Sequence, residues 1–409
     1  MRILLINNFN YIRGGSDRVF FETAKLLRDN GHIVGLFTAD EIDNNSLELS
    51  NVQSFTTLDF LSNSTISTLK KSFLFIKNGQ AQNDLENVLT QFNPDVVHLH
   101  IFQSRLSSFI LKTIYQKNIP MLMTVHEYKM RCPTYLHLDN DGNICEKCSH
   151  LNYTPCIINR CVEGSFSKSL LMALESYSRD LLVPYVTYID KFIMVSEFIR
   201  KKHLERFPKH TDKFIQIYNF IDEQKFDADY SYGNYILYYG RLSKEKGLYT
   251  LLYAAQKQIE IPFVIVGDGI LKEELEQFVI DNNMINVRFI PFQKDGSLSS
   301  LIQNARFTIL PSECYESMGL TVIESFFCKT PVIGAAIGGI KELVKSNENG
   351  FLFESRNIDE LSKVIEKAWN TSPQEHQILA GNGYKFAQKK FNKALYYQKL
   401  LEVYKDIIK

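Results

Sequence analysis

Two glutamates, Glu316 and Glu324, stand on either side of a glycine in a segment that is otherwise rich in apolar residues. The run before Glu316 ends at a proline, and "LTVIESFFCK" after Gly319 has helical spacing, so a helix is expected to begin near Met318 to Leu320. Such a start leaves the backbone N–H groups of these residues at the positive end of the helix dipole, which suits a phosphate. Because helical side chains lean toward the N-terminus, Glu324 is expected to face the same ligand as Glu316.

A nucleotide sugar would use both carboxylates. One can accept hydrogen bonds from the ribose and the other from the sugar, with the diphosphate between them at the helix start. The alternative is that Glu316 is a first-turn carboxylate that stabilises the helix dipole and that Glu324 is an exposed helix residue. Spacing alone leaves both interpretations open.

Two cations lie at another predicted strand end, in "YYGRLSKEKGLYTLLYA". Arg241 and Lys246 are five residues apart, and a planar guanidinium together with an ammonium group can clamp a diphosphate. The alternative is a solvated basic turn. Gly267 and Gly269 in "VGDG" add a glycine turn at a further strand end, which is a weak signal on its own.

The elements that must position these residues are short apolar runs that alternate with segments of helical period. Continuous apolar strands between helices predict a parallel sheet that is covered on both faces. The polar stretch 222–234 separates two series, so we expect an α/β fold of two doubly wound domains, with ligands beyond the carboxyl ends of the strands. The predicted strands are 2–7, 32–38, 95–100, 121–126 and 191–196, and then 235–240, 263–269, 287–292, 307–312 and 331–335.

The composition fits two globular domains. Of the 409 residues, 45% are hydrophobic and 22% are charged, which is enough apolar material for two cores. Lys and Arg number 46, as do Asp and Glu, so no net charge attracts nucleic acid. No apolar run approaches the roughly 18 residues that cross a bilayer. The N-terminal apolar segment is too short for a signal peptide, so a cytoplasmic location is expected.

The motifs together resemble the family-4 retaining glycosyltransferases of the GT-B fold, in which two Rossmann-like domains face a central cleft. The C-terminal half carries "GRLSKEKG", "VGDG", the glutamate pair and "PVIGAAIGGIKELVKSNENGFLF". The N-terminal half matches more loosely, through "GGSD", "PDVVHLH", "TVHEY", "FIMVSEF" and "IYNFID". The resemblance covers nearly the whole chain. Its motifs are specific as a set, although none is decisive alone.

The resemblance implies three segments. Residues 1–220 would form a Rossmann-like domain on the acceptor side, and residues 221–385 would bind the nucleotide sugar. Residues 386–409 would form a helix that returns to the first domain. An apolar helical stripe in this last segment is formed by Tyr397, Leu400, Leu401, Tyr404 and Ile407.

The resemblance also implies roles for the donor-site residues. Arg241 and Lys246 would neutralise the donor diphosphate and act catalytically, because they stabilise the leaving phosphate. The backbone amides near Gly319 and Leu320 would bind the phosphates. Gly267 and Met318 would complete this part of the donor site.

The resemblance also implies which residues contact the ribose, the transferred sugar and the donor phosphate. Glu324 would hold the ribose, and Glu316 would contact hydroxyl groups of the transferred sugar. His126, at the end of strand 121–126, would lie beside the reactive face of the sugar, the alternative being a structural histidine. Gly14 and Gly15 would let the backbone approach the donor phosphate.

The implied activity is the transfer, with retention of configuration, of a sugar from a nucleoside-diphosphate sugar to a glycan or lipid-linked acceptor in bacterial polysaccharide or cell-surface glycan synthesis. Retention ordinarily suggests two carboxylates around the anomeric carbon, but no second candidate is visible. The leaving phosphate would instead deprotonate the acceptor, so no catalytic metal or other cofactor is expected. A nucleotide-sugar epimerase or hydrolase of the same fold and a non-catalytic carbohydrate-binding scaffold are the alternatives.

A cysteine-rich insertion at 127–165 departs from the simplest members of the family and holds five of the seven cysteines. Cys145, Cys148, Cys156 and Cys161 are spaced so that they could bind a structural zinc and stabilise a segment without a core of its own. Free thiols and a redox-active CxxC are the alternatives. The nearby "DNDGN" is expected to form a hairpin turn rather than an Asp-x-Asp metal site.

Two basic stretches are candidates for contact with an anionic surface. In "TLKKSFLFIKNG" three lysines are interleaved with apolar residues, which suits a helix at the cytoplasmic face of a membrane. The stretch "RKKHLERFPKHTDK" carries six Lys or Arg and two acidic residues. For both, a solvated charged face is the alternative.

Overall fold

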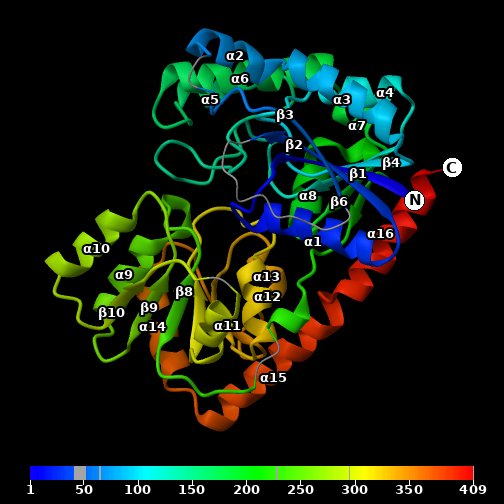
Figure 1. Ribbon diagram of the computed structural model, residues 1–409. Coiled ribbons are helices and arrows are strands. Elements are labelled where there is room, and N and C mark those ends of the chain that lie inside the picture. The colour runs from blue at the N-terminus through cyan, green and yellow to red at the C-terminus, as the bar shows by residue number, and fades with distance from the viewer. Residues whose placement is uncertain (41–51, 64–65, 227–228, 294, 409) are drawn as a thin grey trace. The chain divides into compact units, whose positions relative to one another are not determined.

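The computed structural model describes residues 1–40, 52–63, 66–226, 229–293 and 295–408. The chain divides into two compact units, each built on its own parallel sheet (Figure 1). The first unit comprises Met1–Ile217 and Tyr396–Lys409, and the second comprises Tyr218–Leu395.

The first unit contains a seven-stranded parallel sheet in the order β3-β2-β1-β4-β5-β6-β7. Its strands are β1 (Arg2–Phe9), β2 (Ile33–Asp40), β3 (Gln53–Leu58), β4 (Val96–Leu99), β5 (Met121–Val125), β6 (Lys191–Met194) and β7 (Phe214–Gln216). In the central register Ile3 of β1 lies opposite Val96 of β4. The strand order reverses between these two strands, which is where ligands bind in sheets of this type.

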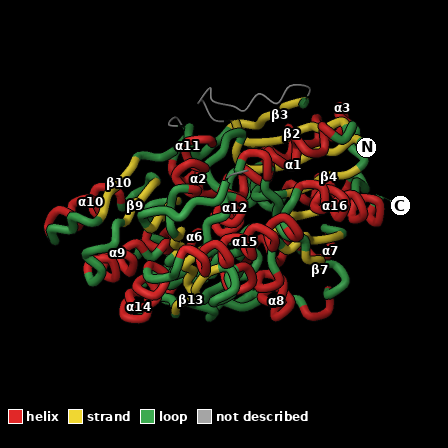
Figure 2. The backbone as a smooth tube through the Cα atoms, turned by 90° about the horizontal axis from the view of Figure 1, so that it is seen from below, coloured by secondary structure: helices red, strands yellow, loops and turns green. Residues whose placement is uncertain are grey.

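The helices of the first unit include one from the far end of the chain. They are α1 (Gly15–Asp29), α2 (Thr68–Ile76), α3 (Gly79–Phe92), α4 (Ile110–Gln116), α5 (Thr154–Ile158), α6 (Phe166–Leu182), α7 (Tyr185–Tyr188), α8 (Glu197–Arg206) and α16 (Lys393–Ile407). Figures 1 and 2 show α16 beside α1 and β4. Its buried ridge is Tyr396, Leu400 and Tyr404, whereas Tyr397 and Leu401 of the predicted stripe are half-buried.

The second unit contains a six-stranded parallel sheet in the order β10-β9-β8-β11-β12-β13. Its strands are β8 (Ile236–Tyr239), β9 (Phe263–Val266), β10 (Val287–Ile290), β11 (Phe307–Leu310), β12 (Val332–Ala335) and β13 (Gly350–Phe353). Its helices are α9 (Leu248–Gln256), α10 (Lys272–Asp281), α11 (Asp295–Gln303), α12 (Leu320–Phe327), α13 (Ile340–Leu343), α14 (Ile358–Trp369) and α15 (Pro373–Lys390). The strand order reverses between β8 and β11.

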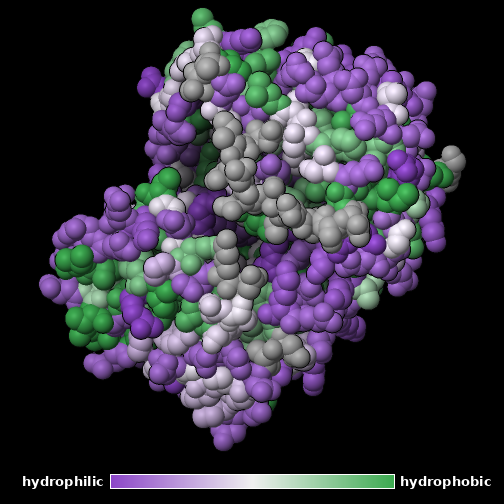
Figure 3. All heavy atoms as spheres, in the orientation of Figure 1, coloured by the Kyte–Doolittle hydropathy of each residue, from purple (hydrophilic) through white to green (hydrophobic). Residues whose placement is uncertain are grey.

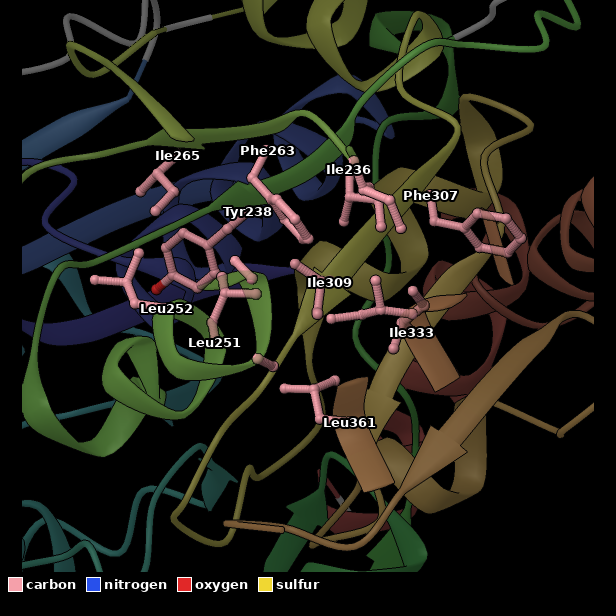
Figure 4. Packing of buried hydrophobic residues seen from close by; sticks show 14 of the residues in the cluster. Ile236, Tyr238, Leu251, Leu252, Phe263, Ile265, Phe307, Ile309, Ile333 and Leu361 are labelled. Atoms are coloured by element: carbon pink, nitrogen blue, oxygen red, sulfur yellow. The ribbon is translucent and has the colours of Figure 1, made fainter. Parts of the chain in front are cut away.

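The core of the second unit explains why its elements form where they do. Ile236 of β8 and Ile309 of β11 are buried with Leu251 of α9 and Leu361 of α14 (Figure 4). In α14 the buried positions Leu361 and Ile365 are one helical turn apart, which places them on one face of the helix. Burying one such side chain contributes about 1.5–3 kcal/mol. This packing fixes the strand ends from which the site is built.

The predicted α/β fold of two parallel sheets is confirmed, but three strands were missed. β3 is a strand at the edge of its sheet, and its residues are mostly exposed or half-buried, so it lacks the apolar run of the central strands. β7 has only three residues, and β13 begins at a glycine. None of the three presents the long buried pattern that identifies a parallel strand.

Candidate active site

The predicted donor-site residues of the second unit follow β8 and β11, the strands on either side of its reversal point. Arg241 and Lys246 come after β8, and Glu316 comes after β11. The helix α12 begins at Leu320, so the expected helix start is confirmed. Its N-cap Gly319 has φ 94°, which favours glycine, and no side chain caps the first N–H groups. These amides can therefore bind an anion.

Lys246 and Glu316 form an ion pair that sequence reasoning did not predict. Nζ of Lys246 lies 2.6 Å from Oε1 of Glu316, and the side chains are 23% and 13% exposed. The hydroxyl of Ser312 donates to the same carboxylate oxygen at 2.6 Å. The structure thus joins the proposed diphosphate cation to the proposed sugar-binding carboxylate.

The electrostatics of this pair keep both groups charged at neutral pH. Burial raises the pKa of Glu316, but the charge and hydrogen bond of Lys246 and the Ser312 hydroxyl together lower this pKa below its ordinary value. For Lys246, burial lowers the pKa, but the Glu316 carboxylate together with Cys314 and Tyr238 raises it above its ordinary value. A negatively charged ligand would meet a cation that is held in place.

The loop that carries Arg241 is held by the glycine turn after β9. Arg241 is exposed, and its positive charge also lowers the pKa of Glu316, although by less than Lys246 and Ser312 do. Gly267 has φ 155°, and a Cβ atom there would lie 1.9 Å from the carbonyl oxygen of Gly240. The turn at Gly267 and Gly269 therefore lets two loops pack closely. A phosphate contact from Gly267 stays a prediction.

Glu324 is a buried residue of α12. Only 5% of the residue is accessible, so the alternative of an exposed helix glutamate is wrong. Burial and then the Glu324 charge raise the pKa of Tyr239, which ends β8. The hydroxyl of Tyr239 donates to the carbonyl oxygen of Thr321 at 2.6 Å. That Glu324 holds a ribose stays a prediction.

His126 of the first unit follows β5 directly and is 9% exposed. Its Nε2 lies 3.0 Å from Nδ1 of His100, the residue after β4, and the two rings are stacked. Burial lowers the pKa of His126 to about 3. At physiological pH this histidine is therefore a neutral hydrogen-bonding group and not a cation.

The glycine loop after β1 is shaped by a buried acid. Gly14 is the N-cap of α1 with φ −167°, an extended conformation that any residue adopts, so backbone geometry does not require a glycine there. The helix begins at Gly15 without a side-chain cap. Asp17 is buried, accepting hydrogen bonds from Nδ2 of Asn7 at 2.9 Å and from the N–H of Arg13 at 3.1 Å. These bonds hold the loop at the start of α1.

Three residues at these sites received no role from sequence reasoning, namely Asp17, His100 and Ser312. Asp17 lies in "GGSD", His100 in "PDVVHLH", and Ser312 in the segment before Glu316. The contact of His100 with His126 joins two strand ends, and spacing along the chain does not reveal such a contact. Asp17 and Ser312 make their contacts close by in the sequence. His100 and Ser312 are the last residues of the predicted strands 95–100 and 307–312, and a polar residue at a strand end was the available signal.

The cysteines of the insertion lie together. A cavity of about 10 Å³ is lined by His137 and by Cys132, Cys145, Cys148, Cys156 and Cys161. The neighbouring Cys161 thiol, followed by burial, raises the pKa of the Cys156 thiol above its ordinary value. Among the described residues, no group of three or more His, Cys, Asp or Glu side chains is arranged to hold a metal ion. The zinc site therefore stays a prediction.

The sequence "DNDGN" forms the expected hairpin turn. Leu138 and Ile144 pair in an antiparallel bridge, and the N–H of Asp139 donates to the carbonyl oxygen of Asn143. The side chain of Asp139 accepts from the N–H groups of Asp141 and Asn143 at 3.1 and 2.8 Å. The side chain of Asp139 thus stabilises the turn.

The two basic stretches differ in the structure. In the second, Lys202 pairs with Glu146 at 2.7 Å and Arg206 with Asp180 at 2.5 Å, so these charges serve internal contacts. The first forms α2, where Leu69 and Phe73 are 86% and 66% exposed. Figure 3 shows apolar side chains on the surface over α2 and α6.

No helix in the described part of the chain is both long and apolar enough to span a membrane.

Several known proteins are similar in sequence. An uncharacterised glycosyltransferase of Methanocaldococcus jannaschii is 29% identical over 205 residues, which cover 50% of this chain and 56% of that protein. The chain thus matches about half the length of this relative and of a second one from the same organism. A 42.6 kDa protein from the cps region of Klebsiella pneumoniae is 24% identical over 90% of this chain and 94% of its own length.

Solved structures show the same fold. Sucrose-phosphate synthase from Thermosynechococcus elongatus superposes with a TM-score of 0.76 at 20% identity, over 99% of this chain and 98% of that one. The Anabaena protein HepE, in complex with UDP and glucose, has a TM-score of 0.69 at 19% identity, over 98% and 99% of the two chains.

Two family models account for most of the sequence. Residues 220–386 match the model described as Glycosyl transferases group 1. Residues 13–225, which are more than half of the 409, match the model described as Glycosyltransferase Family 4. The chain therefore belongs to glycosyltransferase family 4 and has the GT-B fold of that family.

Proposed function

We propose that the protein is a retaining glycosyltransferase that moves a sugar from a nucleoside-diphosphate sugar to a glycan or lipid-linked acceptor. The observation that carries this proposal is the charged pair of Lys246 and Glu316. The pair, Arg241 and the uncapped start of α12 all follow β8 or β11, the two strands between which the strand order reverses. Cations and helix-end amides suit a leaving diphosphate. A carboxylate held in its charged form suits sugar hydroxyl groups.

Relatives support the classes of donor and acceptor. The Anabaena structures contain UDP with glucose, or UDP-glucose, so uridine nucleotides come first among the proposed donors. A Campylobacter jejuni relative, 30% identical over 42% of this chain and 48% of its own length, is named as an N-acetyl-D-galactosaminyltransferase for a glycan on PP-undecaprenol. A lipid-linked acceptor and a role in bacterial polysaccharide or cell-surface glycan synthesis are proposed on this basis.

The proposed reaction assigns the donor diphosphate to the cations and the helix start. Arg241, Lys246 and the amides of Met318, Gly319 and Leu320 bind its phosphates. As the bond between the anomeric carbon and the diphosphate oxygen breaks, negative charge grows on the leaving group, and these donors stabilise it more in the transition state than in the ground state. The acceptor oxygen then bonds to the same face of the carbon. Its proton passes to the leaving phosphate, and no metal is needed for this step.

The remaining residues hold the rest of the donor. We assign the ribose to Glu324 and hydroxyl groups of the transferred sugar to Glu316. In the first unit, neutral His126 contacts the transferred sugar by a hydrogen bond. The N–H groups at the start of α1, at Gly14 and Gly15, contact the donor phosphate.

A thermal-shift screen of nucleoside diphosphates, followed by their sugars, tests the donor class. Turnover with the selected donor and a lipid-linked acceptor is then followed by proton NMR of the anomeric centre. We expect retention of configuration, and an inverted product would contradict the mechanism. Rapid consumption of the donor without an acceptor would indicate a hydrolase or epimerase. Donor binding without turnover would indicate a scaffold.

We also propose that the protein is cytoplasmic and that α2 rests on the membrane face that presents a lipid-linked acceptor. The exposed Leu69 and Phe73 and the lysines of the same stretch suit an anionic phospholipid surface. Sedimentation with anionic phospholipid vesicles tests this contact. The double variant Leu69→Ser, Phe73→Ser should reduce binding, whereas Ile280→Ser, at a 67% exposed position of α10, should not. Equal binding of all three proteins would rule out this contact.

A further inference from the structure

Three histidines lie in a row at the carboxyl ends of β4 and β5. The ring centroids of His98 and His100 are 4.7 Å apart, and those of His100 and His126 are 5.1 Å apart. His98 and His100 are fully buried, whereas His126 is 9% exposed. Within this row, a ligand can therefore reach His126 alone.

All three rings are neutral at physiological pH. Burial, followed by the neighbouring histidines, lowers the pKa of His98 to about 3 and that of His100 well below its ordinary value. Burial alone lowers the pKa of His126 to about 3. A neutral imidazole carries one N–H and one bare nitrogen. In the 3.0 Å contact of His100 Nδ1 with His126 Nε2, one ring must therefore donate and the other accept.

The surroundings of His100 decide the direction of this hydrogen bond. Its Nε2 is buried and has no hydrogen-bond partner within the described part of the chain. A proton on Nε2 would leave an unsatisfied N–H group in the core, which is costlier and rarer than an unsatisfied acceptor. His100 therefore carries its proton on Nδ1 and donates it to Nε2 of His126. His126 must in turn carry its own proton on Nδ1.

The ring of His100 is held so that this direction persists. Phe20 of α1 packs edge-on against it, with the ring centroids 5.3 Å apart. The neighbouring His98 is fixed by contacts on both of its nitrogens, to Oγ1 of Thr124 at 2.8 Å and to the hydroxyl of Tyr404 at 2.7 Å. The helix at the C-terminal end of the chain thus supports the row through Tyr404.

We propose that His100 is a positioning residue, which fixes His126 in the Nδ1–H tautomer so that His126 presents a hydrogen-bond donor to an oxygen of the bound substrate. Nδ1 of His126 makes no hydrogen bond to the described residues, so its proton is available to a ligand. In the other tautomer the ring would present a lone pair, which accepts a hydrogen bond from a hydroxyl group but repels an oxygen that carries no proton, such as a phosphate oxygen. The inference rests on the proposed contact of His126 with the transferred sugar.

Two substitutions at one position, with a matched control, test this assignment. His100→Phe keeps a planar ring but removes the donor, whereas His100→Asn places an amide N–H near the position of Nδ1. His203→Phe is the control, because His203 is another fully buried histidine of the first unit, with Nδ1 bonded to the carbonyl oxygen of Ile199 at 2.8 Å. We expect His100→Phe to lower kcat by about 10²-fold, the scale of one lost catalytic hydrogen bond, with little change in donor KM. His100→Asn should recover at least part of this loss, and His203→Phe should keep the wild-type kcat.

Long-range proton–nitrogen NMR of the histidine rings provides a readout that a merely structural role would not change. His126 should be the Nδ1–H tautomer in the wild type and in His100→Asn, and should lose this preference in His100→Phe. An Nε2–H tautomer in the wild type would overturn the inference even if His100→Phe failed to fold.

The variant His126→Ala separates the two proposals. Wild-type turnover in His126→Ala would overturn the proposed contact of His126 with the sugar, whatever His100 does. Impaired His126→Ala together with wild-type kcat and tautomer in His100→Phe would overturn the positioning role alone.

Discussion

The polar groups beyond the strand ends differ in kind between the two units. In the second unit, Lys246 and Glu316 are charged, partly exposed and joined at 2.6 Å. In the first unit, His98, His100 and His126 form a neutral row of which two members are fully buried. Both sets lie at carboxyl ends of parallel strands next to a reversal of strand order. The same architecture thus supports either a charged or a neutral site.

The cause of this difference lies in the partners that each group finds. Lys246 and Glu316, which are half-buried, stay charged because each neutralises the other, and the hydroxyl of Ser312 donates a further hydrogen bond to the carboxylate. Within the described part of the chain, the three histidines have no acidic partner, so burial decides their charge. A charged group suits a diphosphate, whereas the tautomer of a neutral imidazole determines which of its nitrogens donates a hydrogen bond.

We expect the largest loss of turnover when the cation of the charged pair is removed. Lys246→Ala should lower turnover by about 10³-fold, because a fixed donor to the leaving phosphate is lost and Glu316 is left buried without its partner. Initial rates with the sugar donor measure this effect. Lys244→Ala is the matched control, since Lys244 is exposed in the same loop. Similar rates for the two variants would remove Lys246 from the site.

The two glutamates should separate into different roles. Glu324→Gln should weaken binding of the nucleoside diphosphate itself by about 1.5–3 kcal/mol, the range for a lost hydrogen bond to a charged group. Glu316→Gln should leave that affinity nearly unchanged and reduce turnover, because its contact is to the sugar that is transferred. Calorimetry and initial rates on the same preparations measure both. Equal effects of the two changes on nucleotide binding, with turnover intact, would show that the carboxylates are misassigned.

The charged pair should also give stability a defined pH range. The folded-state pKa of Glu316 is depressed, so its contribution is present above the ordinary value of 4.5 and is lost as pH falls through the folded-state pKa. The folded-state pKa of Lys246 is raised, so its contribution is fully present below 10.5 and is lost as pH rises through the higher folded-state value. Between these limits the free energy of unfolding should exceed that of Glu316→Gln by about 3 kcal/mol, the lower end of the range for breaking a buried pair. A difference that does not shrink in acid would contradict this assignment.

The smallest effect on turnover is expected from the cysteine cluster. Zinc at Cys145, Cys148, Cys156 and Cys161 predicts about one metal ion per chain, lost in Cys148→Ser and retained in Cys328→Ser, which lies outside the insertion. Elemental analysis measures this ratio. Turnover should persist in a chelator, because the proposed chemistry uses no metal. Metal-free protein with native thiols that titrate freely would reject the zinc site.

Sequence patterns predicted the fold because buried parallel strands leave a continuous apolar signal. The runs at 2–7 and 307–312 became the central strands β1 and β11, whereas the edge strand β3 has no such run and was missed. The helix start at Leu320 was also predictable, because Gly319 disfavours a helix interior and an apolar pattern of helical period follows it.

Contacts between strand ends were not predictable in the same way. The ion pair joins positions 246 and 316, and the histidine contact joins positions 100 and 126. Each of these contacts depends on the order of strands in a sheet and on side-chain rotamers, and neither of these leaves a local pattern in the sequence. The buried position of Glu324 likewise follows from packing around α12 and not from its spacing to Glu316.

We propose that Arg241 and Lys246 of the second unit bind the diphosphate of a nucleotide-sugar donor. The most direct test is calorimetric titration of the nucleoside diphosphate that the thermal-shift screen selects into the wild type, Arg241→Ala and Arg288→Ala. Arg288 provides the control, because it is an exposed arginine of the same unit on the edge strand β10. We expect saturable binding that Arg241→Ala weakens at least tenfold, or about 1.4 kcal/mol, and that Arg288→Ala leaves unchanged. Failure of every nucleoside diphosphate to bind, or equal affinities for the two arginine variants, would contradict this proposal.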